Sequence, residues 1–275
     1  MPDLNDRFDF DNAWICECGP VRGNNEDMFL ALPKEGIYVV ADGMGGASAG
    51  EIASHLICDT LADALADAGR ESPGNRKYTF HQTLHKINTA VNEYREAHGY
   101  RSMGSTIVAI LFNPWDATSA DIVNCGDSRC YCCRNGELLK LSIDHTLDRA
   151  YKDNPAFAGK SNVLTNHIGA VDYMTASWQR ISVCPGDIFI LCSDGLTTCV
   201  SDEDIQDILS AEGGAEKKVQ ELQKAVLAGG GKDNYTILCI VIPDELPGPQ
   251  AVDEEERQES DLLYQIAEKR KDYGK

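Results

Sequence analysis

Apolar and polar positions follow two different periods in the first third of the chain. Three short runs have the character of strands, and they span residues 14–18, 28–32 and 37–41. Apolar positions then recur at helical spacing along two stretches. The first begins with Ser48 and Glu51, which form a capping-box pair, and ends near Gly69. A Gly/Pro/Asn-rich loop at 69–76 separates it from a second amphipathic helix, whose apolar positions are Phe80, Leu84, Ile87, Val91 and Tyr94.

After Gly104 the pattern changes to consecutive strands without intervening helices. These strands cover residues 105–112, 120–125, 129–134 and 138–141, and Asn135 and Gly136 form a hairpin turn. Such an order disfavours a doubly wound parallel sheet and favours antiparallel pairing with the helices on outer faces. The predicted fold class is therefore α+β. The stretch 144–169 has weak periodicity, and we interpret it as a loop-rich surface insertion.

The last third returns to a mixture of strands and helices. Strands are expected at residues 177–184, 187–192 and 235–242, and helices at residues 201–209 and 216–227. Pro185 and Gly186 make the turn between the first two strands. Ser201 and the acidic residues that follow it suit a helix N-terminus. Beyond Pro243 the composition indicates an acidic linker and C-terminal tail, residues 244–275, with a modest helix pattern.

The net charge and the length of the chain exclude some classes of function. A chain of 275 residues is long enough to bury a sizeable core, as one large domain or two small ones. The net charge of −19 and the absence of a dense basic stripe would repel phosphate polyanions. We therefore expect no nucleic-acid partner and no membrane partner. No apolar run reaches the length of about 18 residues that spans a bilayer.

The eleven cysteines are interpreted as thiols of a cytoplasmic protein. The first residues lack both the basic and the apolar region of a secretory leader, which argues against an oxidising compartment. Cys16 and Cys18 lie in a strand-like run, as do Cys130, Cys132 and Cys133. None has the paired C-x-x-C spacing of zinc sites, so core or strand-face packing is the preferred interpretation.

Five short segments each place an aspartate at a turn, and three of these turns abut an apolar strand-like run. The aspartates are Asp27, Asp42, Asp127, Asp194 and Asp233. One such turn is ordinary, but five at the strand ends of one sheet would bring carboxylates within reach of shared ions. Oxygen ligands favour Mn²⁺ or Mg²⁺ over zinc. Arg22, close to the first of these turns, has a guanidinium suited to phosphate oxygens, with a plain surface arginine as the competing interpretation.

These segments resemble the signature of the type 2C metal-dependent protein Ser/Thr phosphatases. The matching motifs, in order, are Arg-x-x-Asn-Glu-Asp at 22–27, Asp-Gly-Met-Gly-Gly at 42–46, Gly-Ser-Thr at 104–106, Gly-Asp-Ser-Arg at 126–129, Asp-His at 144–145, Ser-Asp-Gly-Leu at 193–196 and Asp-Asn-x-Thr at 233–236. The resemblance covers residues 14–242. It implies a four-layer α-β-β-α sandwich with two central antiparallel sheets and a dinuclear metal centre at one end. The catalytic domain would span residues 1–243, with a flap-like insertion at about 146–168.

The resemblance also implies which residues hold the ions. Asp42 would bridge two Mn²⁺ or Mg²⁺ ions, and the carbonyl of Gly43 would ligate one of them. Asp194 and Asp233 would hold the other. Arg22 would bind the phosphate group, and Arg22, Asp42 and Asp194 would be the catalytic residues.

Three further carboxylates receive subsidiary roles from the same resemblance. Glu26 and Asp27 would orient bound waters or ligate the ions directly. Asp127, together with Asp194, would hold a weaker third ion. The proposed nucleophile is water activated by the metal ions, so neither Ser193 nor a cysteine is expected to attack the phosphate.

The chain departs from the family pattern at three places. Met44 stands where the eukaryotic branch has His, and this form resembles the bacterial branch. Asn166 and His167 replace the usual Arg and a small residue, and the segment between Asp144 and Leu164 is shorter than usual. We interpret His145 as a packed or hydrogen-bonded structural residue.

The resulting hypothesis is a bacterial-type phosphatase that hydrolyses phosphoserine and phosphothreonine in proteins and opposes a cognate Ser/Thr kinase in signal transduction. The alternative is a catalytically weak relative with the same fold that binds phosphoproteins or regulates. A Rossmann dinucleotide enzyme fits poorly, because the glycine pattern at 43–48 lacks its third Gly or Ala and Asp42 would repel a pyrophosphate.

Overall fold

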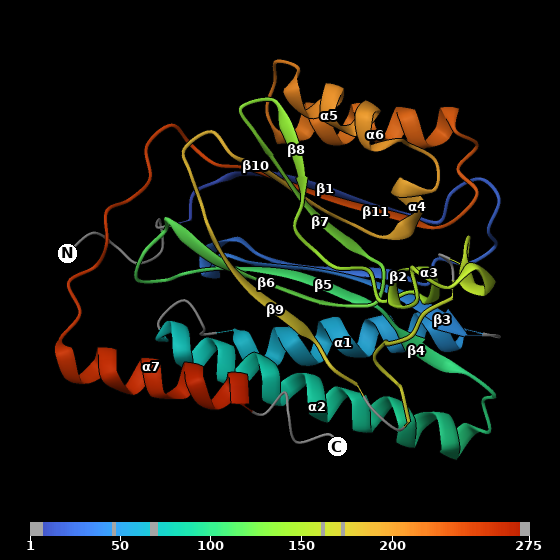
Figure 1. The fold of residues 1–275 in the computed structure, drawn as a ribbon, viewed down its shortest axis with the longest axis horizontal. Coiled ribbons are helices and arrows are strands. Elements are labelled where there is room, and N and C mark those ends of the chain that lie inside the picture. Colours follow the sequence, from blue (N-terminus) through green and yellow to red (C-terminus); the bar gives the residue numbers. More distant parts are fainter. Residues whose placement is uncertain (1–7, 46–47, 67–70, 161–162, 172–173, 270–275) are drawn as a thin grey trace.

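The structure, a computed structural model, consists of two antiparallel sheets packed face to face between helices (Figure 1). It describes residues 8–45, 48–66, 71–160, 163–171 and 174–269. Gly46 of the second aspartate motif and Gly69, the expected end of the first helix, lie outside these residues. Every pair of neighbouring strands named below is antiparallel.

Each sheet combines strands that are distant in sequence. In spatial order, the first sheet contains β1 (Asp11–Glu17), β11 (Tyr235–Val241), β10 (Ile188–Cys192), β7 (Arg129–Arg134) and β8 (Glu137–Lys140). The second contains β2 (Asp27–Leu32), β3 (Ile37–Gly45), β5 (Ile107–Phe112), β6 (Ser119–Cys125) and β9 (Ser177–Ser182), with the short β4 (Met103–Ser105) paired to β3.

Helices cover the outer face of each sheet. The second sheet carries α1 (Ala49–Leu65) and α2 (Pro73–His98), and α7 (Glu254–Lys269) packs on α2. The first sheet carries α5 (Asp202–Ser210) and α6 (Ala215–Ala228), with the one-turn α4 (Asp194–Thr197) at its edge. In the segment predicted to be loop-rich, the helical elements among the described residues are the short α3 (Leu147–Ala150) and a 3₁₀ turn at Pro155–Phe157. The predicted fold class, an α-β-β-α sandwich, is confirmed.

Successive side chains of the central strands point to opposite faces of the sheet and fill the cores on both of these faces. Val40 and Val108 point into the core between the two sheets, where they meet Leu191 and Leu238. Val39, the neighbour of Val40, points the other way into the core beneath α1 and α2. Because successive strand residues face opposite sides, a strand buried on both faces reads as a continuous apolar run. This explains the pattern at residues 37–41.

The predicted hairpin turn is confirmed, and the second predicted turn joins different sheets. Asn135 and Gly136 adopt positive φ angles of 53° and 79° between β7 and β8, which suits a two-residue hairpin. The turn at Pro185 and Gly186 connects β9 to β10. Since β9 pairs with β6 and β10 with β7 and β11, this turn carries the chain from the second sheet to the first.

Two predictions about helix starts were wrong. Ser48 has a left-handed φ of 67° and makes no capping hydrogen bond to α1, so the capping box with Glu51 does not form. The Glu51 carboxylate accepts a hydrogen bond from Asn24 instead. The loop expected at 69–76 is partly helix, because α2 already begins at Pro73. There Ser72 accepts a hydrogen bond from the N–H of Asn75, and proline suits the first helical position.

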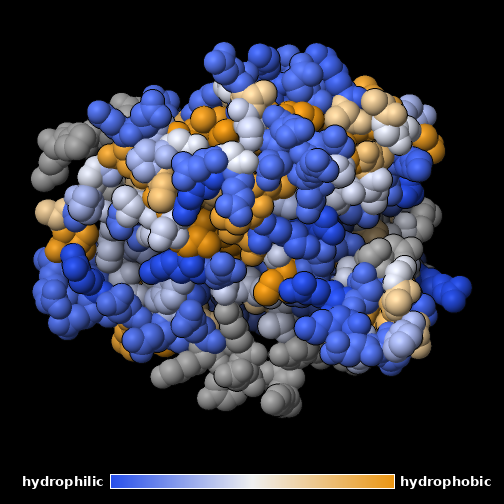
Figure 2. All heavy atoms as spheres, turned by 45° about the horizontal axis from the view of Figure 1, so that its top comes forward, coloured by the Kyte–Doolittle hydropathy of each residue, from blue (hydrophilic) through white to orange (hydrophobic). Residues whose placement is uncertain are grey.

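The surface agrees with the strongly acidic composition. Figure 2 shows a face that is mainly hydrophilic, with hydrophobic residues scattered in small groups. Among the described residues, no helix is both long and apolar enough to cross a membrane.

The C-terminal helix α7 is bound to the rest of the fold by a buried polar network. The Ser260 hydroxyl accepts a hydrogen bond from the N–H of Gly74 at 2.9 Å, in the first turn of α2. The buried ammonium of Lys77 lies 3.3 Å from the ring centroid of Tyr264. The Tyr264 hydroxyl donates to Asp121 at 2.8 Å, and the Arg180 guanidinium lies over the same ring. The helix therefore contributes specific contacts to α2, β6 and β9.

This network predicts graded losses of stability. Tyr264→Phe removes one hydrogen bond to a charged acceptor and should lower the free energy of unfolding by about 1 to 2 kcal/mol. Tyr264→Ala also removes the ring from two cations and should cost about 3 kcal/mol or more. Urea denaturation measures both. Leu262→Ala, on the same helix at a side chain that is 57% exposed, is the control and should change stability by less than about 0.5 kcal/mol. Wild-type stability of Tyr264→Ala would contradict this docking.

Candidate metal centre

The predicted carboxylates all lie at one end of the sandwich, because the strands that carry them are antiparallel neighbours. Asp27 begins β2 and lies opposite Asp42 near the end of β3. In the first sheet the end of β10 lies beside the starts of β7 and β11. Asp127 lies in the turn before β7. Ser193 follows the end of β10 and Asp194 comes next, while Asp233 lies shortly before the start of β11. Sequence positions more than 200 residues apart thereby share one site.

The five aspartates are close enough to act on one another electrostatically. Asp42 is influenced by the charges of Asp27, Asp194, Asp127 and Asp233. Burial raises the pKa of Asp194, the charge of Asp233 raises it further, and the Asp42 side chain lies close enough to lower it. The arrangement therefore concentrates negative charge in a largely buried space.

Burial raises the pKa values of this cluster, and mutual repulsion raises them further. Loss of solvation is the main cause of the raised pKa values of Asp27, Asp42 and Asp194, and neighbouring aspartates add to it in each case. Burial and the charge of Asp194 raise the pKa of Asp127 to about 7. Glu26, which is less buried, shows a raised pKa from the same loss of solvation, opposed by Arg22.

Asp27 is the most firmly held of the carboxylates. One of its oxygens, Oδ2, accepts hydrogen bonds from the hydroxyls of Ser193 at 2.6 Å and Thr236 at 2.8 Å. The N–H of Thr236 donates to Ser193 Oγ at 3.0 Å and completes the triangle. The other carboxylate oxygen of Asp27 remains to be shared with a ligand or a bound water.

The main chain of Asp42 is fixed by the loop between β4 and β5. The Thr106 hydroxyl accepts from the N–H of Asp42 at 3.1 Å, and the N–H of Thr106 donates to the Asp42 carbonyl at 2.8 Å. Ser105 Oγ donates to the same carbonyl. The Gly-Ser-Thr motif thus sets the direction in which the Asp42 side chain leaves β3.

Gly43 lies where the start of α1 crosses the end of β3. A Cβ atom on Gly43 would stand 2.2 Å from the carbonyl oxygen of Gly50 and 2.5 Å from that of Glu26, so a side chain is excluded. The N–H of Gly43 donates to the Glu26 carbonyl at 3.0 Å. Burial raises the pKa of the Glu26 carboxyl, and the Gly50 backbone at the start of α1 is one of the groups that oppose this rise. The helix N-terminus therefore favours the negative charge of Glu26.

Arg22 lies at the site, but its guanidinium contacts one of the carboxylates of the site itself. Its Nη2 donates to Asp233 Oδ2 at 2.6 Å, and half of the side chain is exposed. Among the described residues, no three or more His, Cys, Asp or Glu side chains are arranged to hold an ion as they stand. The contacts give the reason, since Asp233 is turned toward Arg22 and one oxygen of Asp27 is taken by hydroxyls.

The donor set nevertheless fits divalent cations. Five aspartates, Glu26 and the backbone around Gly43 offer only oxygen donors, which Mn²⁺ and Mg²⁺ prefer. Buried carboxylates at this density are costly unless a cation compensates them. Arg22 and Arg129 supply positive charge, and Arg129 is itself paired with Asp144, which leaves most of the cluster uncompensated.

The residues that position these carboxylates escaped prediction from the sequence. The strand pattern indicates an ordinary strand-end role for Ser193, but this residue holds Asp27. The sequence pattern indicates only a turn position for Asn234. Its amide accepts from the N–H of Glu26 at 2.9 Å and donates to the carbonyls of Cys18 and Asn24. The hydroxyl and amide residues inside the aspartate motifs were the available signal.

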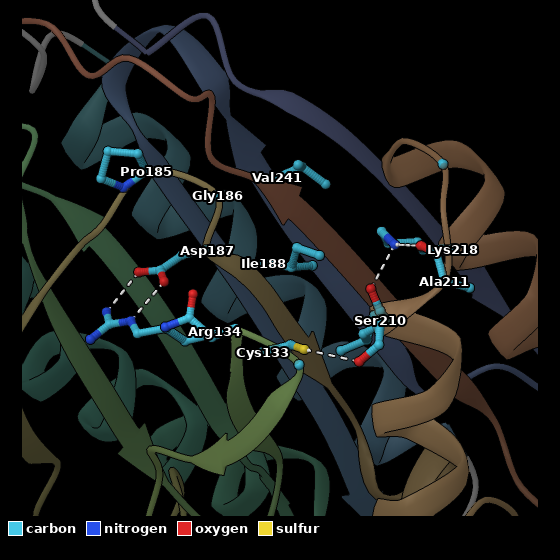
Figure 3. Close-up of a pocket in the computed structure, with 14 residues that line it drawn as sticks. Cys133, Arg134, Pro185, Gly186, Asp187, Ile188, Ser210, Ala211, Lys218 and Val241 are labelled. Carbon is cyan, nitrogen blue, oxygen red and sulfur yellow. Dashed lines mark hydrogen bonds and ion pairs between the residues drawn. The ribbon is translucent and has the colours of Figure 1, made fainter.

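A pocket of about 340 Å³ lies at the opposite end of the first sheet (Figure 3). Its lining residues include the ends of β7 and β11 and the start of β10. On one side Arg134 forms a bidentate ion pair with Asp187. On the other, the buried ammonium of Lys218 donates to the carbonyls of Leu209 and Ala211 at the end of α5, each at 2.7 Å. This pocket is separate from the carboxylate site because it lies at the other end of the sheet. Its charged side chains, Arg134, Asp187 and Lys218, are already paired within the protein.

A double-sheet sandwich with carboxylates converging at one end fits the class of metal-dependent phosphoprotein phosphatases, and comparison with known proteins gives the family. The protein phosphatase 2C model matches residues 23–226. The serine/threonine phosphatase stp of Listeria innocua is 29% identical over 234 residues, which is 81% of this chain and 92% of that protein. The serine/threonine protein phosphatase PstP of Mycobacterium tuberculosis is 33% identical over 82% of this chain and 44% of its own length.

Solved structures agree with these relatives. PppA, a key regulatory component of T6SS in Pseudomonas aeruginosa, is 34% identical with a TM-score of 0.77, covering 84% of this chain and 96% of that chain. The catalytic domain of PstP in complex with two manganese ions is 30% identical with a TM-score of 0.75, covering 86% of this chain and 99% of that one. The chain therefore belongs to the protein phosphatase 2C family. The predicted family and enzyme class, protein serine/threonine phosphatase, are confirmed.

The raised pKa values predict how stability depends on pH when no ions are bound. Asp127 has a folded pKa of about 7 against an ordinary 3.8. Between these values the unfolded chain ionises while the folded chain keeps its proton, so the contribution of Asp127 is complete below 3.8 and lost as pH rises to about 7. Urea denaturation of chelator-treated protein should therefore show stability falling between about pH 4 and about pH 7.

Asp127→Asn, which cannot titrate, provides the matched comparison and should show a shallower fall. Saturating Mn²⁺ should reverse the trend, because the ions displace protons from the carboxyl groups. A stability profile that is equally steep in both proteins would contradict the raised pKa of Asp127.

Proposed function

We propose that this phosphatase uses the carboxylate cluster to bind two Mn²⁺ or Mg²⁺ ions and hydrolyses phosphoserine and phosphothreonine esters at that place. The observation that carries the proposal is the convergence of Asp27, Asp42, Asp127, Asp194 and Asp233 from both sheets. The manganese ions in the related PstP structure support the choice of metal. A third, weaker ion is part of the proposal, held by Asp127 and Asp194.

The position of each side chain supports the ligand role that the family resemblance implies for it. Asp42, at the centre of the cluster, would bridge the two ions, with the Gly43 carbonyl on one side. Asp194 and Asp233 would hold the ion on the other side. Glu26, beside the N-terminus of α1, and the second carboxylate oxygen of Asp27 would orient water. When bound, the two ions would stabilise the attacking and leaving oxygens of an in-line displacement and make water a stronger nucleophile.

Water is the proposed nucleophile because the nearby nucleophilic side chains are engaged or buried. Ser193 and Cys192 are both fully buried, and the Ser193 hydroxyl donates a hydrogen bond to Asp27. Burial raises the pKa of Cys16 and keeps it a thiol. The reaction therefore proceeds without a phosphorylated enzyme intermediate in this proposal.

The proposed substrates and cellular compartment extend what the family implies. Phosphorylated proteins are the proposed substrates, in particular those of a cognate Ser/Thr kinase, in the cytoplasm. No partner of nucleic-acid or membrane type is proposed, given the net charge of −19. Such a phosphatase would reverse kinase signals.

Asp194→Asn tests the ligand role with little change of shape. The amide is a poor ligand for hard cations, so Mn²⁺-stimulated hydrolysis of a phosphothreonine peptide and of p-nitrophenyl phosphate should fall by more than about 100-fold. Asp207→Asn, on the exposed side of α5, is the control and should keep wild-type rates. Full metal-stimulated turnover of Asp194→Asn would refute the assignment. A wild-type protein without any metal-stimulated turnover would favour the alternative of a phosphoprotein-binding relative.

Arg22→Ala separates phosphate binding from metal binding. The guanidinium should leave Asp233 and hold phosphate oxygens when substrate binds, so its loss should lower kcat/KM for the phosphopeptide by about 10-fold or more. Mn²⁺ affinity measured by calorimetry should stay the same or increase, because Arg22 no longer competes for Asp233. Arg257→Ala on α7 is the control. Unchanged kcat/KM in Arg22→Ala would rule out the phosphate role.

A further inference from the structure

His145 closes the turn that presents Asp127. The N–H of His145 donates to the Gly126 carbonyl at 2.9 Å, and the N–H of Gly126 donates to His145 Nδ1 at 3.2 Å. One residue thus binds both main-chain polar groups of the glycine next to Asp127. Since Nδ1 accepts a hydrogen bond, the imidazole is neutral and carries its proton on Nε2. That proton is donated to Ser177 Oγ at 2.9 Å, at the start of β9.

The Gly126 turn depends on this support. Its φ is +116°, and a Cβ atom there would lie 2.6 Å from the side chain of Thr106. The backbone therefore holds a conformation that favours glycine while it packs against the loop that fixes Asp42. The direction of the Asp127 carboxylate is set by this turn, and the hydrogen bonds from His145 keep the turn in place.

The same histidine is joined to the base of the flap-like insertion. The N–H of Thr165 donates to the His145 carbonyl at 2.8 Å. Asn166, which replaces the usual arginine of relatives, has its amide nitrogen 3.3 Å from His145 Nδ1. The Asn166 amide also pairs with both main-chain groups of Thr175. The two ends of the insertion are thereby tied together beside Gly126.

We propose that His145 is a positioning residue that fixes Asp127 for the weakest-bound ion, so that the base of the flap and this ion are held by one side chain. The inference rests on the proposed function, because it requires Asp127 to be a ligand. It assigns His145 no contact with substrate. Loss of its Nδ1 acceptor should weaken binding of the third ion while leaving the two tighter ions and the fold unaffected.

Two substitutions separate the acceptor next to Gly126 from simple packing. In His145→Asn, the amide oxygen takes the place of Nδ1 and keeps the hydrogen bond from Gly126. In His145→Gln, the longer amide reaches toward Ser177 and leaves the N–H of Gly126 without that acceptor. His55→Asn and His55→Gln, at an exposed position on α1, are the matched controls. Mn²⁺ binding to the full-length protein is measured by calorimetry, alongside thermal unfolding and the Mn²⁺ dependence of peptide hydrolysis.

The expected result is a difference between the two amides. His145→Gln should raise the Kd of the weakest Mn²⁺ step by about 10-fold or more, as loss of an orienting group does at other metal sites. His145→Asn should stay within about 3-fold of wild type. Wild-type Mn²⁺ affinity in His145→Gln overturns the proposal. Equal losses in both variants, accompanied by a lower melting temperature, also overturn it and leave His145 a packing residue.

Asp127→Asn, measured in parallel, distinguishes this proposal from the one it rests on. If Asp127→Asn loses the weakest step while His145→Gln keeps it, only the positioning role fails. If Asp127→Asn binds Mn²⁺ as wild type does, or wild type lacks a weaker step, the assignment of Asp127 fails and the role of His145 falls with it.

Discussion

Repulsion among five aspartates at one end of the sandwich is the constraint on which the rest of the structure depends. Buried carboxylates lose solvation and repel one another, and their raised pKa values record both effects. The protein offsets part of this cost locally. Hydroxyls of Ser193 and Thr236 stabilise Asp27, and Arg22 lies against Asp233. The remainder is the electrostatic cost that the proposed divalent cations would offset.

The fold brings these charges together through the alternation of strand directions. In two antiparallel sheets every second strand ends where its neighbours begin, so loops that are distant in sequence gather at one end. Hydrogen bonds then fix each turn from another part of the chain. Thr106 holds Asp42, Asn234 holds Glu26 and His145 holds the turn before Asp127. The geometry of the cluster is therefore a property of the whole sandwich.

The elements that the sequence predicted well are those with local causes. The strand at 37–41 has a distinctive apolar run, and the Asn135–Gly136 turn has a backbone requirement of its own. The aspartates were also visible, because they lie at turns beside such strands. Ser48 failed as a cap because the start of α1 is fixed by the close approach of Gly50 to Gly43, a contact between distant elements.

The supporting residues could not be read from one sequence for the same reason. Ser193 and Thr236 meet Asp27 only after β10 and β11 pair and the two sheets pack. The tail gave only a modest helix pattern, because the specificity of α7 comes from Tyr264 and the buried Lys77 of α2. Long-range polar contacts of this kind leave no periodic signal.

Anomalous diffraction from crystals grown with Mn²⁺ tests the central claim most directly. Two strong manganese peaks about 3.5–4 Å apart are expected, both in contact with Asp42, one beside the Gly43 carbonyl and the other beside Asp194 and Asp233. Manganese bound away from these carboxylates, or an absence of ordered manganese at this end of the sandwich, would contradict that claim.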